Sequence, residues 1–225
     1  MNIQSHEFVL PRPCRYYIAN DEPNTFTALV LALHGYGSNP ETMLRLTRPS
    51  VDASVLVAAL EGPNQHYTQD GPGGGVAAYN WGIKQHHADA VATHHAMVQH
   101  ALAELQAHYR LAPKQCFLAG FSQAVGFNYR FLGTHPGAVG GVIAICGGVP
   151  KDWESSGYAD FTTPILHISR SEDEFFPKSF SEAMPARLRS HAQDVEFHML
   201  PGMHRYPSNA RDFIRPFMRR VLSMA

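Results

Sequence analysis

Cysteine is scarce in this chain, and long apolar runs are absent from it. The three cysteines, Cys14, Cys116 and Cys146, form no CxxC pair, which excludes a disulfide framework and a zinc ribbon. No apolar stretch approaches the about 20 residues that a membrane helix requires. The N-terminus lacks the basic segment and following apolar segment of a signal peptide. We therefore expect a soluble, cytoplasmic protein.

The net charge of the chain is also close to zero. Lysine and arginine together number 18 and aspartate and glutamate 19, which gives a net charge of −1. Such a chain has no overall excess of positive charge that would attract nucleic acid or an anionic membrane surface. We expect neither as a partner and expect a small-molecule substrate instead, while the oligomeric state stays open.

What the 225 residues do contain is a regular alternation of apolar segments and helical patterns. Runs of Val, Ile, Leu and Ala without polar alternation predict buried strands. These strands are predicted at 28–33, 55–60, 115–119, 139–146 and 164–168, with a more alternating one at 195–200 and a first antiparallel one at 14–19. Helices are predicted at 85–109, 122–131, 177–191 and 208–222.

This order predicts one α/β domain over residues 1–225, with a mostly parallel sheet flanked by helices on both faces. Pro185 and Pro216 lie inside the last two helical patterns and are expected to delay, kink or break them. Residues 61–81, which contain the segment GPGGG, are predicted to form an irregular loop. The many histidines of the 85–109 helix are expected to form a solvated face rather than a metal site, because no HExxH pattern is present.

A candidate nucleophile follows the strand at 115–119. The segment Gly120-Phe121-Ser122-Gln123-Ala124 leads from that strand into a helix, as a G-x-S-x-G-like nucleophile elbow does. The small residues allow a tight turn that holds the Ser122 hydroxyl out of the sheet edge. The alternative is a serine that only caps the helix.

A candidate oxyanion hole follows the strand at 28–33. His34-Gly35-Tyr36-Gly37 has the His-Gly-x-Gly pattern of a backbone oxyanion element at the end of a strand. We expect the backbone N–H groups of Tyr36 and Gln123 to hold a developing oxyanion, whereas an ordinary glycine turn is the alternative. His34 is interpreted as a buried structural residue.

A serine nucleophile needs a base, and the base needs a carboxylate to orient it. In the order Ser, acid, His, the acid follows a late strand, and Asp173 is our choice over Glu172 and Glu174. The three acids could also form a solvated loop. The base is His204, in the turn Pro201-Gly202-Met203-His204 after the strand at 195–200.

These residues resemble the phospholipase/carboxylesterase family of α/β-hydrolases, which includes acyl-protein thioesterases and small esterases. The matching segments are LVLALHGYGSNPETM, FLAGFSQA, TPILHISRSEDEFFP and the PGMH turn. The resemblance implies an α/β-hydrolase fold without a cap domain, and hydrolysis through an acyl-enzyme with no cofactor or metal. Ala124 departs from the family's usual glycine.

The sequence therefore predicts a serine carboxylesterase that cleaves esters of small to medium acyl groups. A thioesterase or a peptidase with the same three residues is the alternative among enzymes, and a catalytically silent binding module is the alternative outside them. Trp81 and Phe176 are aromatic candidates for the lining of the substrate pocket, although core packing explains them equally well.

Overall fold

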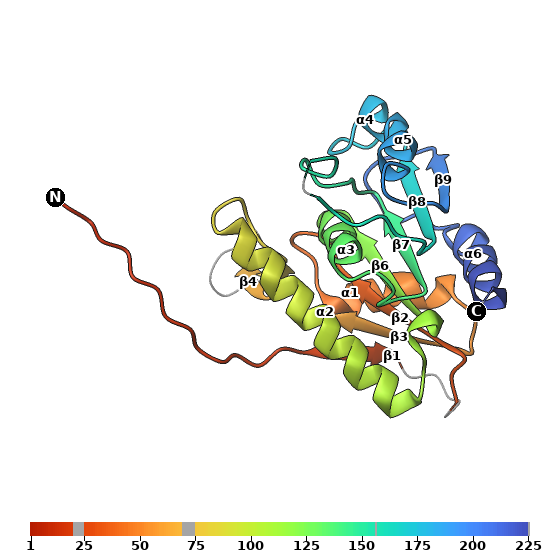
Figure 1. Cartoon of the computed structure of the whole chain (residues 1–225), viewed down its shortest axis with the longest axis horizontal. Coiled ribbons are helices and arrows are strands. Elements are labelled where there is room, and N and C mark those ends of the chain that lie inside the picture. Colours follow the sequence, from red (N-terminus) through yellow and green to blue (C-terminus); the bar gives the residue numbers. More distant parts are fainter. Residues whose placement is uncertain (20–24, 69–74, 156, 225) are drawn as a thin grey trace.

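A seven-stranded sheet organises the computed structural model, which describes residues 1–19, 25–68, 75–155 and 157–224. Among these residues the strand order is β1-β3-β2-β6-β7-β8-β9. Only β1 is antiparallel to its neighbour, and the other neighbouring strands pair in parallel (Figure 1). The strands are β1 (Tyr16–Ala19), β2 (Ala28–Leu33), β3 (Val55–Leu60), β6 (Cys116–Phe121), β7 (Gly141–Ile145), β8 (Ile165–Arg170) and β9 (Val195–Leu200).

Helices cover both faces of this sheet. They are α1 (Pro40–Thr47), α2 (His87–Tyr109), α3 (Gln123–Thr134), α4 (Lys178–Glu182), α5 (Met184–Leu188) and α6 (Arg211–Ser223), with short 3-10 turns at Arg48–Ser50 and Pro113–Gln115. Because side chains alternate along a strand, Leu29 and Leu31 of β2 join the core under α2, α3 and α5, whereas Val30 joins the core under α1 and α6. The predicted fold class, a mostly parallel sheet between two helical layers, is confirmed.

The predicted bounds of three strands agree with the structure. The bounds predicted at 28–33, 55–60 and 195–200 agree with β2, β3 and β9. The helix predicted at 177–191 is split into α4 and α5, with Pro185 at the start of the second helix. The last helix begins late, at Arg211, and continues through Pro216 because its apolar stripe is buried against the sheet.

The interpretation of residues 61–81 as irregular is wrong. Within this stretch β4 (Asn64–Tyr67) pairs antiparallel with β5 (Ala77–Asn80) in a separate two-stranded sheet. The residues of β4 are polar and mostly exposed, so no buried apolar run marked the strand. Of the GPGGG segment, residues 71–74 lie outside the described residues.

The interpretation of the α2 histidines as a solvated face is wrong for His94. This side chain is fully buried, edge-on to Trp81, and its Nε2 lies 3.2 Å from Asn128 Oδ1. Burial lowers the pKa of His94 to about 3, so the imidazole is neutral at physiological pH.

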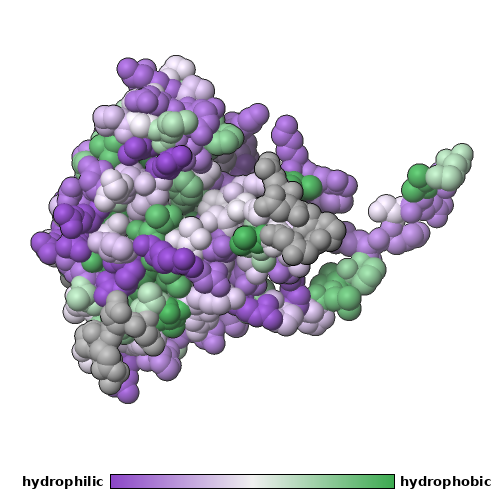
Figure 2. Space-filling view, turned by 180° about the vertical axis from the view of Figure 1, so that it is seen from behind, coloured by the Kyte–Doolittle hydropathy of each residue, from purple (hydrophilic) through white to green (hydrophobic). Residues whose placement is uncertain are grey.

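The first residues of the N-terminal segment are exposed. Its large apolar side chains are exposed and it projects from the body as an extended arm, on which green apolar patches are visible (Figure 2). In the described part of the chain no helix combines the length and the apolarity that crossing a bilayer requires.

Candidate active site

Ser122 occupies a strained turn between β6 and α3. Its φ is 55°, a left-handed conformation that non-glycine residues rarely adopt. Small neighbours make the turn possible, since a Cβ on Gly120 would lie 2.6 Å from Asn128 Nδ2. Ala124, in place of a glycine, is accommodated fully buried. The turn exposes the serine hydroxyl at the carboxyl edge of the sheet.

The structure brings Ser122, His204 and Asp173 into one hydrogen-bonded chain. His204 Nε2 lies 2.8 Å from Ser122 Oγ, and His204 Nδ1 lies 2.7 Å from Asp173 Oδ2. With Nδ1–H donating to the carboxylate, Nε2 is free to accept the proton of the serine hydroxyl. The three residues come from loops after β6, β8 and β9, which parallel pairing places at one edge of the sheet.

Among the three neighbouring acids only Asp173 reaches the imidazole. Its side chain is 1% exposed, and its Oδ1 accepts hydrogen bonds from the N–H groups of Phe175 and Phe176. Glu172 and Glu174 are exposed. Glu174 instead accepts a hydrogen bond from the backbone N–H of His204 at 3.0 Å, which lowers the pKa of Glu174.

The two backbone groups expected to bind an oxyanion flank Ser122. Tyr36 follows β2, and a Cβ on Gly35 would lie 3.1 Å from Ser122 Cβ, so the absence of a side chain there lets this loop approach the serine. Gln123 is the first residue of α3, where N–H groups have no intrahelical acceptor. No acceptor in the described residues receives a hydrogen bond from either N–H.

Comparison of the sequence with known proteins identifies its family. The model of the phospholipase/carboxylesterase family matches residues 17–222, nearly the whole chain. The chain belongs to the phospholipase/carboxylesterase family. It is a carboxylic ester hydrolase. No curated protein matches the sequence.

Solved esterase structures share the fold of this family member. Esterase PE8 is 23% identical, with a TM-score of 0.72, over 92% of this chain and 99% of that one. A phospholipase/carboxylesterase from Dyadobacter fermentans is 20% identical, with a TM-score of 0.71, over 92% and 97%. A carboxylesterase from Bacillus cereus is 16% identical, with a TM-score of 0.72, over 92% and 94%.

Three phenylalanines surround the imidazole of His204 in this esterase. The ring centroids of Phe121, Phe175 and Phe176 lie 5.1, 4.9 and 5.8 Å from that of His204. Of the three, only Phe176 is among the pocket residues predicted from the sequence. Phe121 directly precedes Ser122, and Phe175 lies two residues after Asp173, so their positions in the sequence could have indicated them. These rings pack around the imidazole in the orientation that joins the serine and the carboxylate.

Trp81, the other predicted pocket residue, does not reach the surface. Its side chain is fully buried, and its indole N–H donates to the carbonyl of His34 at 2.7 Å. His34 is itself buried, and its Nε2 accepts a hydrogen bond from the N–H of Gly62 at 3.1 Å. Burial lowers the pKa of His34, in keeping with a neutral structural imidazole. Both side chains are therefore buried structural contacts of the loop that follows β2.

One group of side chains near the serine has the donor types of a metal site. One ligand atom from each of Cys146, Asp173 and His204 lies within 4.8 Å of the others. However, the imidazole and the carboxylate already satisfy each other by a hydrogen bond. Burial also raises the pKa of Cys146 to about 12, which opposes the thiolate form that binds metal. The hydrogen bond and the protonated thiol therefore make this group a poor fit for a metal ion.

Proposed function

We propose that this esterase cleaves carboxylic esters through a Ser122-His204-Asp173 triad and an acyl-enzyme intermediate. The observation that carries the proposal is the continuous hydrogen-bonded chain from Ser122 Oγ through the imidazole to the buried carboxylate. A serine hydroxyl is a poor nucleophile at its own pKa, and an adjacent neutral imidazole overcomes this by accepting its proton.

In the first half-reaction Ser122 Oγ attacks the ester carbonyl carbon while His204 Nε2 accepts the hydroxyl proton. The buried carboxylate of Asp173 stabilises the resulting imidazolium. When the tetrahedral intermediate collapses, the imidazolium gives its proton to the leaving alkoxide and the acyl group stays on Ser122. In the second half-reaction His204 deprotonates a water molecule, which attacks the acyl-enzyme carbonyl. When this second tetrahedral intermediate collapses, the imidazolium returns the proton to Ser122 Oγ and the acid is released.

Negative charge that develops on the carbonyl oxygen requires donors that are already in place. The backbone N–H groups of Tyr36 and Gln123 are suited to this role because they lack protein acceptors among the described residues. Each such donor contributes about 3–4 kcal/mol of transition-state stabilisation. The N-terminus of α3 adds its positive dipole end at the same place.

Exposed apolar side chains lie close along the chain to the proposed catalytic residues, which suits an apolar acyl group. Tyr36, Phe175 and Met203 are all more than half exposed, and each is within two residues of a proposed catalytic or oxyanion residue. Apolar contact with these side chains favours esters of small to medium acyl chains over charged substrates. Matched ester, thioester and amide substrates of one acyl chain would rank the possible leaving groups.

A fluorophosphonate probe tests the assignment of the nucleophile. We expect stoichiometric labelling of Ser122 in the intact protein and no labelling of Ser122→Ala. The same variant is expected to lose activity on a p-nitrophenyl ester by about 10⁴- to 10⁶-fold. Labelling or near-normal turnover of a folded Ser122→Ala protein would show that another residue is the nucleophile.

A further inference from the structure

The two proposed oxyanion donors belong to separate parts of the chain. Tyr36 lies in the loop after β2, and Gln123 begins α3 after β6. Within the described residues no hydrogen bond joins the loop of residues 34–38 directly to residues 120–124. The two parts do touch elsewhere, since β2 pairs with β6 as far as Leu33 and Gly120 and Gly35 lies against Ser122. Beyond these contacts, hydrogen bonds that fix the spacing of the two N–H groups come from a segment that binds both parts.

The segment of residues 79–82, which comprises the end of β5 and the two residues after it, makes these contacts. On one side it pairs with the oxyanion loop, since the Gly37 N–H donates to the Tyr79 carbonyl at 3.0 Å and the Tyr79 N–H donates to the Ser38 carbonyl at 2.8 Å. The indole of Trp81 adds the hydrogen bond to the carbonyl of His34. The segment is thus bound to both ends of the loop that carries Tyr36.

On its other side the same segment is held by the side chain of Gln123. The carboxamide oxygen accepts the Trp81 N–H at 3.0 Å, and the carboxamide nitrogen donates to the Gly82 carbonyl at 2.7 Å. These two bonds match both polar ends of the amide and so define its orientation. The residue that offers its backbone N–H to the substrate thereby fixes its own position through its side chain.

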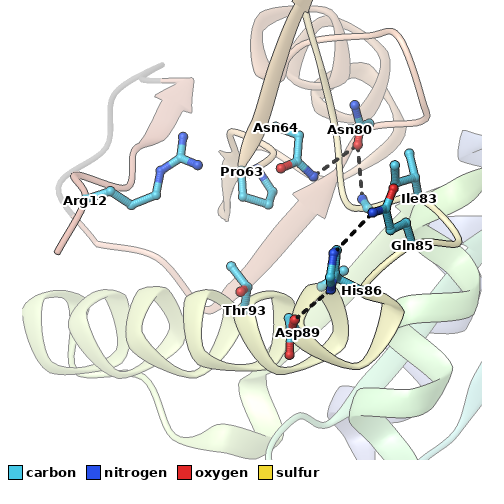
Figure 3. A pocket seen from close by; sticks show the side chains of 11 residues that line it. Arg12, Pro63, Asn64, Asn80, Ile83, Gln85, His86, Asp89 and Thr93 are labelled. Carbon is cyan, nitrogen blue, oxygen red and sulfur yellow. Dashed lines mark hydrogen bonds and ion pairs between the residues drawn. The ribbon is translucent and has the colours of Figure 1, made fainter. Parts of the chain in front are cut away.

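The segment itself has little freedom to move. A Cβ on Gly82 would lie 2.5 Å from Ala90 Cβ, so the backbone there is in close contact with α2. The buried Asn80 accepts hydrogen bonds at Oδ1 from Asn64 Nδ2 and from the Gly82 N–H, both at 3.1 Å (Figure 3). A groove of about 600 Å³ borders Asn80 and Gly82, so on that side the segment relies on these bonds rather than on close packing.

We propose that the side chain of Gln123 is a positioning residue that sets the spacing of the oxyanion hole through residues 79–82. This inference rests on the proposed function of Ser122 and of the two backbone donors. Because hydrogen-bond energy falls steeply with distance and angle, a shift of one donor weakens the stabilisation of the transition state. The side chain does not touch the reacting atoms, so its effect is on kcat and not on substrate affinity.

The Gln123→Met variant tests the proposal because methionine keeps the length of the side chain and loses both hydrogen bonds. We expect kcat per titrated active site to fall about 10- to 100-fold with KM changed by less than about threefold, as a displacement of about 1 Å near the chemistry would cause. Gln123→Glu keeps the acceptor for the Trp81 N–H but not the donor for the Gly82 carbonyl. We expect its kcat per active site to lie between those of Gln123→Met and the natural protein.

Gln115 offers a matched control at the opposite end of β6. Its side chain also bridges two backbone groups, accepting from the Ala112 N–H at 2.9 Å and donating to the Thr27 carbonyl at 3.0 Å. Gln115→Met therefore loses the same pair of bonds away from the site. We expect it to lower thermal stability without a change in kcat per active site.

A second readout separates positioning from general loosening of the fold. In the transition state of a thionoester the negative charge develops on sulfur, which N–H donors spaced for an oxygen stabilise poorly. The ratio of oxoester to thionoester turnover therefore measures how well the two donors stabilise an oxyanion. We expect this ratio to fall at least about 10-fold in Gln123→Met and to be unchanged in Gln115→Met. If Gln123→Met does not fold, the same ratio in Gln123→Glu decides.

Two results would overturn the inference. The first is normal kcat and a normal ratio in folded Gln123→Met, and the second is an equal loss in the two methionine variants. In either case an inactive Ser122→Ala protein would leave the proposed function intact. An active Ser122→Ala protein would instead refute the proposed function itself.

Discussion

Replacing Asp173 by asparagine probes the electrostatic centre of the proposed triad with almost no change in shape. The Oδ1 atom of Asp173 accepts two backbone N–H groups, from Phe175 and Phe176, at 2.9 and 2.8 Å. An asparagine must therefore turn its carbonyl oxygen to these donors. Its NH₂ group then faces His204 Nδ1, the atom that now lies 2.7 Å from Oδ2.

That orientation puts the imidazole in the wrong tautomer. Nδ1 becomes an acceptor, the proton moves to Nε2, and Nε2 can no longer accept the proton of Ser122. The side chain of Asp173 is 1% exposed, so water cannot replace the lost acceptor. We expect kcat/KM to fall about 10⁴-fold, which corresponds to about 5 kcal/mol of transition-state stabilisation.

The assay is the initial rate on a p-nitrophenyl ester near neutral pH, normalised by thermal denaturation to the folded fraction. Glu174→Gln is the matched control, because glutamine can still accept the hydrogen bond from the His204 N–H and the residue is exposed. We expect this control, and Glu172→Gln, to stay within about threefold of the natural protein. An unchanged rate in Asp173→Asn, with activity abolished in either control, would refute the assignment of the acid.

Two further predictions concern stability. A Cβ on Gly147 would overlap Val125 Cβ behind the serine turn, so Gly147→Ala should lose about 1–3 kcal/mol and lower both Tm and kcat. Gly126→Ala, whose new Cβ would meet only the Gly148 carbonyl at 3.4 Å, is the tolerated control, and equal Tm values would contradict the packing argument. Burial lowers the pKa of His167 to about 4 from an ordinary value of 6.5, so the unfolded chain takes up a proton first as pH falls. His167 alone should contribute a decline in stability of up to about 1.4 kcal/mol per pH unit between about pH 6.5 and 4, and an equally steep urea-unfolding profile in His167→Gln would argue against this origin.

Local sequence patterns predicted the framework of this esterase because its central strands, such as β2 and β3, are fully buried. An uninterrupted apolar run such as residues 28–33 has few other stable placements, and the order of strands and helices then restricts the topology. The turn at Ser122 was also predictable, since the small residues that it needs are adjacent in sequence.

Other features depended on contacts between distant residues. Asp173 differs from Glu172 and Glu174 only by its burial and by its distance to an imidazole 31 residues away. His94 carries no local sign that Trp81 and Asn128 enclose it. The polar strand β4 forms because β5 pairs with it and not because of its own composition.

The sequence by itself determined which segments are buried and in what order the proposed catalytic residues follow them, because burial and chain order are properties of local pattern. Only the tertiary structure decided which carboxylate meets His204 and that the side chain of Gln123 binds residues 81 and 82. Hydrogen bonds of this kind act over about 3 Å, and only the folded chain brings such distant residues that close.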